Sequence, residues 1–223
     1  MNTVYTEALL QDIRAWLPTQ ISGKRLAHTL AVEKECCSLA ALFARFPTLL
    51  SEEDVMKLRV AALLHDVTKE KTLEEQLALC QAYHIKLTPY EGATLKVLHS
   101  KTGAAYAKEH LHAHLGYACV DERISDAIFT HTTGAAEMSL MGKLLYLADY
   151  IEPTRSFSEC IELRTLFYTD IETHASTENA LLAHLDAVIL TSLDMTVCEL
   201  VADGRLIDPH TVEARNALIY KRK

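Results

Sequence analysis

The apolar residues of this chain recur at the spacing of an amphipathic helix, and signals that start helices precede many of these stretches. Residues 51–54 and 72–75 match the capping-box pattern, and Pro89 follows Thr88 at a typical first helical position. Alternating runs bounded by turn residues, which indicate strands, are scarce. The sequence therefore predicts an all-α fold of nine to eleven helices, near residues 3–17, 23–46, 52–65, 72–84, 89–99, 101–113, 121–131, 137–150, 159–172, 177–202 and 209–221.

Length and composition favour one domain over the whole chain, residues 1–223. Domains typically hold ~100–200 residues, and 49% of this chain is apolar, which is enough for a sizeable core. The 7 Gly and 5 Pro residues are too few for a disordered or fibrous chain. The stretch 152–158 is the best candidate for a break, but amphipathic helices continue after it, so we expect no second domain.

Charge and targeting signals narrow the function class and the compartment. The formal net charge of −8 disfavours binding to nucleic acid or to an anionic membrane surface, because both need excess Lys and Arg. The N-terminal residues do not resemble a signal peptide, and no apolar run reaches the ~18–20 residues that span a bilayer. We therefore expect a cytoplasmic protein whose 6 cysteines stay reduced. The oligomeric state stays open, with a homodimer among the alternatives.

Among the 11 histidines, several lie on the apolar faces of predicted helices. Helical spacing turns four histidines and two aspartates toward the core: His28, His65, Asp66, His99, His131 and Asp149. A single histidine on such a face is usually a hydrogen-bonded core residue. Six such side chains on five helices favour a metal site instead, because imidazole and carboxylate suit iron, manganese or zinc. Six protein ligands fit two metal ions better than one closed structural ion.

Five short segments occur in order along the chain: Arg25–His28, Leu63–Lys69, Leu98–His99, His131–Gly134 and Leu147–Pro153. A closing segment, Thr211–Ala217, follows them. This ordered set resembles the signature of the HD-domain metal-dependent phosphohydrolases, in particular the bacterial YqeK type of symmetrical diadenosine tetraphosphate hydrolases. The match covers roughly residues 22–218. The resemblance implies a helical bundle with a binuclear metal site in its core.

The resemblance also implies which side chains hold the metals and what reaction they serve. Four side chains match the residues that define the HD metal site: His28, His65, Asp66 and Asp149. Two more histidines, His99 and His131, match the pair that makes this branch binuclear, with Asp66 as the bridging ligand. The implied cofactors are two divalent ions, iron first, with manganese or another transition metal as the alternative. The implied reaction cleaves diadenosine tetraphosphate at its central phosphoanhydride and yields two ADP.

The chemistry of such a centre suggests further roles for residues around it. Two dications ~3.5–4 Å apart neutralise phosphate oxygens and generate a bridging hydroxide near neutral pH. Asp66 would hold the metals and Asp149 would also orient the hydroxide, so both are candidate catalytic residues, together with Lys69. Because the net charge is unfavourable for a polyanionic substrate, local donors must compensate: Arg25, Lys69, Thr132, Thr133, Gly134 and Arg155. The alternatives are solvated surface for the cations and a plain helix-terminating turn for residues 132–134.

Other histidines and other functions fit the sequence less well. The stretch with His110, His112 and His114 is polar, so we expect a solvated helix face there and not a metal site. Four further histidines stay unassigned: His84, His174, His184 and His210. We expect Trp16 and Tyr5 to lie in the core. The alternative substrates are a dNTP, a nucleoside monophosphate or a guanosine polyphosphate. The alternative from another class is a non-catalytic HD-like binding module, which would be expected to lack metal ligands.

Overall fold

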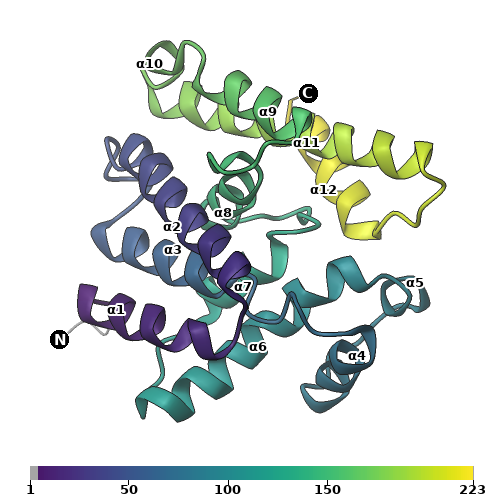
Figure 1. Ribbon diagram of the computed structural model, residues 1–223. Coiled ribbons are helices and arrows are strands. Elements are labelled where there is room, and N and C mark those ends of the chain that lie inside the picture. The colour runs from purple at the N-terminus through teal and green to yellow at the C-terminus, as the bar shows by residue number, and fades with distance from the viewer. Residues whose placement is uncertain (1–4, 223) are drawn as a thin grey trace.

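The computed structural model describes residues 5–222, and every regular element in that range is helical (Figure 1). The predicted all-α class is confirmed. The elements are α1 (Glu7–Trp16), the 3₁₀ helix η1 (Leu17–Thr19), α2 (Gly23–Phe43), α3 (Glu52–Leu64), α4 (Leu73–Ala82), α5 (Pro89–Gly92), α6 (Leu95–Leu115), α7 (Glu122–Thr130), α8 (Leu140–Ile151), α9 (Ser158–Tyr168), α10 (Ile171–His174), α11 (Glu178–Ala202) and α12 (Pro209–Tyr220).

The expected start signals act as caps in the structure. Ser51 and Thr72 each accept a hydrogen bond from the backbone N–H of the third residue of α3 and α4, and the acidic side chain at that position accepts one from the backbone N–H of the cap residue. Ser22 caps α2 in the same way, through the backbone N–H of Arg25. Each such cap satisfies a backbone donor that a helix leaves unpaired at its start.

Three predicted boundaries are wrong, each for a local reason. The predicted helices 89–99 and 101–113 are instead the short α5 and one continuous α6, within which Ser100 donates its hydroxyl hydrogen to Val97 O at 2.8 Å. The predicted helix 159–172 divides into α9 and α10, because Asp170 adopts a left-handed φ of 53°. The predicted helix 3–17 begins at Glu7, because Thr6 has an extended backbone and caps the helix by accepting from the Leu9 backbone N–H; residues 3 and 4 lie outside the described range.

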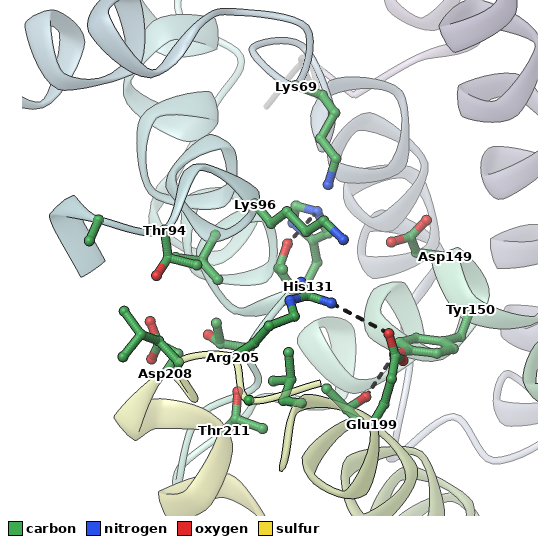
Figure 2. A pocket seen from close by; sticks show the side chains of 18 of the residues that line it. Lys69, Thr94, Lys96, His131, Asp149, Tyr150, Glu199, Arg205, Asp208 and Thr211 are labelled. Atoms are coloured by element: carbon green, nitrogen blue, oxygen red, sulfur yellow. Dashed lines mark hydrogen bonds and ion pairs between the residues drawn. The ribbon is translucent and has the colours of Figure 1, made fainter. Parts of the chain in front are cut away.

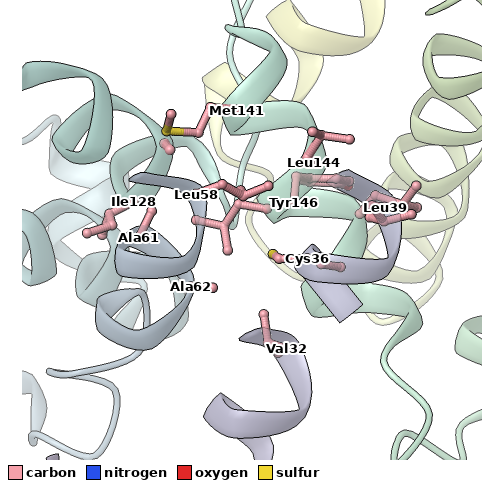
Figure 3. Packing of buried hydrophobic residues seen from close by; sticks show 14 of the residues in the cluster. Val32, Cys36, Leu39, Leu58, Ala61, Ala62, Ile128, Met141, Leu144 and Tyr146 are labelled. Carbon is pink, nitrogen blue, oxygen red and sulfur yellow. The ribbon is translucent and has the colours of Figure 1, made fainter. Parts of the chain in front are cut away.

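Helices α2, α3, α7 and α8 pack against one another around the central core (Figure 3). Ten labelled side chains from these helices are at most 2% exposed: Val32, Cys36, Leu39, Leu58, Ala61, Ala62, Ile128, Met141, Leu144 and Tyr146. The Tyr146 hydroxyl forms a hydrogen bond with Ser192 Oγ at 3.1 Å, which ties α8 to α11. These four helices therefore give the polar site described next a rigid scaffold.

The remaining helices flank this scaffold. Helix α4 packs on α6, while α11 packs on both α9 and α12 (Figure 1). Within residues 5–222, no helix combines the length and apolar character that a bilayer crossing requires.

Candidate metal centre

Two imidazoles of the centre are fixed in the same way, each at the carboxyl end of a helix. His65 is the C-cap of α3 and His131 is the C-cap of α7. In each ring Nδ1 lies 2.6 Å from the carbonyl oxygen three residues earlier, Ala62 O or Ile128 O. A carbonyl oxygen only accepts, so Nδ1 carries the proton and Nε2 presents its lone pair to the centre.

A third imidazole is oriented by a carboxylate that the sequence analysis missed. His28 Nδ1, on α2, donates to Glu152 Oε1 at 3.1 Å. Glu152 is 1% exposed, and both of its carboxylate oxygens accept hydrogen bonds of 2.6 Å from Thr154. The opposite ring nitrogen, His28 Nε2, lies 3.0 Å from Asp149 Oδ1 on α8. Glu152 lies in the segment Leu147–Pro153, which carried part of the family resemblance and was the available signal.

Asp66 lies at the middle of the cluster, with one oxygen toward each pair of histidines. Its Oδ2 is 3.7 Å from His28 Nε2 and 3.5 Å from His65 Nε2. Its Oδ1 is 3.2 Å from His99 Nε2 and 3.8 Å from His131 Nε2. The structure thus brings together all six side chains that helical spacing turned inward, from the ends or inner faces of five helices.

Three atoms of this cluster are buried without a hydrogen-bond partner: His28 Nε2, His65 Nε2 and Asp66 Oδ1. Buried polar atoms are almost always paired in folded proteins, so these atoms indicate a ligand that the side chains share. Their ligand atoms fall into overlapping groups of three, each group within 4.8 Å, and a nitrogen and carboxylate set of this kind suits borderline divalent ions. The residues therefore fit the divalent metal ions that the family resemblance implies.

The protonation states of two of the histidines and of both aspartates also suit metal ligands. Burial lowers the pKa of His65 to about 4 and that of His99 to about 3, so both rings are neutral at pH 7. Burial opposes the charged form of the two aspartates as well, but their neighbours outweigh it. His65 beside Asp66, and Arg155 beside Asp149, hold the pKa of these carboxyls well below the usual range. Neutral imidazoles and ionised carboxylates are the forms that bind cations.

Basic side chains surround the cluster. Arg25 Nη1 donates to Asp66 Oδ2 at 2.7 Å, and Arg155 Nη2 donates to Asp149 Oδ1 at 2.6 Å. Lys69 Nζ lies 3.0 Å from the nearest imidazole nitrogen, and burial lowers the pKa of this lysine. The structure thus places all three predicted phosphate-binding cations against the cluster, where each can turn toward an incoming anion.

A pocket of about 600 Å³ opens from the cluster (Figure 2). One wall carries Lys69, His131 and Asp149, and the opposite wall comes from α11, α12 and the loop between them, with Glu199 and Arg205. Ligand pockets typically measure ~300–1,000 Å³, so this one has room for a nucleotide. The pocket joins the cluster of His28, His65, Asp66, His99, His131 and Asp149, called the HD cluster below, to helices near the C-terminus.

The three predicted donors after His131 have different surroundings. Thr132 Oγ1 lies 3.1 Å from Nε2 of both His99 and His131, and it lines the pocket. Thr133 also lines the pocket, but its hydroxyl donates to Gly134 O. Gly134 is not part of the lining. Gly134 has a left-handed φ of 70°, which a turn requires here, and an added Cβ would lie 2.9 Å from the Ala214 side chain of α12. The turn and the close approach of α12 therefore explain why this residue is glycine.

The other histidines lie away from this cluster. Three of them are exposed on α6, as expected: His110, His112 and His114. Trp16 is 5% exposed in the core, and Tyr5 packs partly buried against it. His210 belongs to a second group, with Glu91 and Asp208, whose ligand atoms also lie within 4.8 Å of one another. In the sequence this histidine was unassigned, because Glu91 is far away along the chain and Asp208 alone gives no cluster.

Comparison with known proteins identifies the family of this arrangement. The HD domain model matches residues 25–154. The symmetrical bis(5'-nucleosyl)-tetraphosphatase of Halalkalibacterium halodurans is 30% identical over 91% of this chain and 93% of its own length. The protein of the same name from Bacillus subtilis is 27% identical over 94% and 97%.

A solved structure shares the whole architecture. It is a crystal structure described as a predicted HD superfamily hydrolase involved in NAD metabolism, from Clostridium acetobutylicum. Its TM-score is 0.76 at 30% identity, over 96% of this chain and 97% of that one.

Proposed function

The chain belongs to the HD-domain family of hydrolases, and we propose that it cleaves diadenosine tetraphosphate symmetrically into two ADP. The proposal is supported by the activity named for relatives that match more than nine-tenths of the chain. The single structural observation that carries it is the Asp66 carboxylate, which turns one oxygen to His28 and His65 and the other to His99 and His131.

This arrangement divides the ligands between two divalent ions. One ion would be held by His28, His65 and Asp149 and the other by His99 and His131, and Asp66 would serve both. The division is supported by two groups of ligand atoms that each lie within 4.8 Å of one another, His28–His65–Asp66 and Asp66–His99–His131. We propose iron as the resident metal, as the family resemblance implies, with manganese or another transition metal as the alternative; imidazole and carboxylate ligands suit all of these ions. When bound, such ions supply positive charge against phosphate oxygens and lower the pKa of water toward neutrality.

The chain's own side chains bind and orient the substrate. Arg25, Lys69 and Arg155 already lie beside the cluster, and their charges bind the oxygens of a phosphate chain that enters the pocket. Thr132 Oγ1 adds a neutral donor between two imidazoles. Asp149, which is ionised and lines the pocket, orients the attacking water by accepting a hydrogen bond from it.

We further propose that residues 1–223 form one domain that works in the cytoplasm. The first part is supported by α11, which packs on α9 and α12 and lines the same pocket as the HD cluster. The second is supported by free thiols at Cys36, Cys80, Cys119 and Cys160, all buried, which suit a reducing compartment.

The product pattern tests the proposed reaction. Protein purified without oxygen, with its metal quantified, is given diadenosine tetraphosphate, and the nucleotides are separated by anion-exchange chromatography. We expect ADP as the only product. An equal mixture of ATP and AMP would contradict symmetrical cleavage, and faster turnover of a dNTP, a nucleoside monophosphate or a guanosine polyphosphate would favour one of those substrates instead.

A further inference from the structure

A second hollow adjoins the pocket of the metal cluster. It measures about 410 Å³. Four of its lining residues do not line the larger pocket: Phe157, Glu159, Cys160 and Met195. The two hollows share a wall: Lys96, Tyr150, Arg155, Thr196 and Glu199. Because the volume of each is within the range of ordinary ligand pockets, each has room for one part of a larger ligand.

The shared wall suits the phosphate chain of such a ligand. Arg155 donates to Asp149 at 2.6 Å, and its Nε is buried without a hydrogen-bond partner. Lys96 is exposed on α6 and lines the larger pocket (Figure 2), and it also lines the second hollow. A guanidinium and an ammonium at the junction attract phosphate, and a chain bound there directs its two ends into different hollows.

The lining of the second hollow suits a nucleoside. The Phe157 side chain is 67% exposed at the start of α9, and among residues 5–222 it forms no aromatic pair. An exposed ring beside a pocket offers a face on which a base can stack. Glu159 and Glu199 add carboxylate oxygens that can accept hydrogen bonds from ribose hydroxyls.

We propose that this hollow binds the second nucleoside of the substrate, with its base stacked on Phe157, while the first nucleoside lies in the larger pocket. The inference rests on the proposed function and deepens it, since it makes Phe157 a residue that selects substrates with two nucleosides. A substrate with one nucleoside gains nothing from this ring.

Paired substrates test the proposal. Wild-type holoenzyme and Phe157→Ala are compared on diadenosine tetraphosphate and on adenosine 5'-tetraphosphate, which carries one nucleoside. We expect Phe157→Ala to raise KM for the dinucleotide about tenfold and to leave KM for the mononucleotide unchanged, because base stacking on an aromatic ring is lost. Phe157→Tyr keeps the ring and should restore the low KM. Tyr220→Ala removes another exposed ring, 78% accessible, at the C-terminal end of α12, and should leave KM for both substrates unchanged.

The possible results separate this inference from the proposed function. If Phe157→Ala weakens both substrates equally, or weakens neither, the second nucleoside does not stack on this ring and the inference is overturned. If wild type cleaves adenosine tetraphosphate and not the dinucleotide, both the inference and the proposed cleavage of diadenosine tetraphosphate are overturned, and only a phosphohydrolase activity on another substrate stands. If wild type cleaves neither, the proposed function itself is overturned.

Discussion

Two clusters of histidine and carboxylate in this molecule look alike in composition and differ in how their atoms are used. The HD cluster around Asp66 and the second group, Glu91–Asp208–His210, each place three or more ligand atoms within 4.8 Å. In the HD cluster, two Nε2 atoms and one carboxylate oxygen are buried and unpaired. In the second group, both oxygens of Glu91 are bonded, one to Lys101 Nζ at 2.7 Å and the other to the Thr88 backbone N–H at 2.6 Å.

The difference shows that free lone pairs, and not residue types, mark a metal site. Lys101 and Glu91 are both nearly fully buried, so the lysine ammonium occupies the place of a cation in the second group. His210 Nδ1 lies 3.0 Å from Asp208 Oδ1 at the cap of α12, and only Asp208 Oδ2 is unpaired. The HD cluster has the free ligand atoms that a divalent metal would need, whereas the second group ties α12 to α5 and α6.

The largest expected effect comes from Asp66→Ala. Loss of the carboxylate between the two histidine pairs should lower turnover by about 10³-fold or more, because both ions lose a ligand. Metal content should fall, while far-UV circular dichroism stays helical, since the core of α2, α3, α7 and α8 does not include this side chain. Turnover equal to wild type would rule out the proposed centre.

The second group should respond to substitution in stability and not in metal content. Lys101→Met leaves Glu91 buried without its ion-pair partner, and we expect a loss of about 3 kcal/mol in the free energy of unfolding. Metal per chain should be unchanged. Lys108→Met, an exposed lysine on the same helix, is the matched control. A lower metal content in Lys101→Met would mean that the two clusters are not separate.

Acid dependence tests the same ion pair. Burial opposes ionisation of Glu91, but hydrogen bonds from Lys101 and Thr88 outweigh it and lower its pKa from 4.5 to about 2. A depressed folded-state pKa stabilises the protein above the unfolded value, and that stability is lost as pH falls through the folded pKa. The stability difference between wild type and Glu91→Gln should therefore be constant above pH 5 and shrink toward pH 2. Denaturant unfolding at several pH values measures it, and a difference that does not shrink would contradict the assignment.

The sequence predicts one cluster and not the other for a physical reason. His65, Asp66 and Asp149 lie in strongly apolar helical stretches, so the helical spacing of the apolar residues is enough to predict that these side chains face the core. Glu91 and His210 lie in short polar stretches, where the spacing of apolar residues does not predict which way a side chain faces. Only the approach of α12 to α5 brings the two residues together. Glu152 was missed for a related reason, since its partner His28 is 124 positions away. Helix classes and capped starts are local and were predictable, whereas the left-handed Asp170 that divides α9 from α10 was not.

Glu152→Gln tests whether an orienting carboxylate matters at the HD cluster. The amide keeps the shape but loses the charge that fixes the His28 ring, and such outer contacts contribute about 10- to 100-fold in metal affinity. We expect a drop near the low end of that range, because the substitution leaves the contacts that orient four other ligands in place. These ligands are His65, Asp66, His131 and Asp149. Titration of the metal-free protein with Mn²⁺ measures it, with Glu162→Gln, an exposed residue of α9, as the control. Unchanged affinity would mean that His28 needs no orienting group.

The smallest expected effect is that of His210→Ala, and it gives the sharpest contrast between the clusters. The His210 side chain is 36% exposed, and its hydrogen bond to Asp208 duplicates one that the His210 backbone N–H already donates to the same oxygen at 2.9 Å. Removal of the ring should cost about 1 kcal/mol or less in stability. Metal content and turnover should stay at wild-type values, because no ligand of the HD cluster is touched. Loss of one metal ion per chain in this variant would instead make the second group a metal site and remove the distinction drawn from its bonded oxygens.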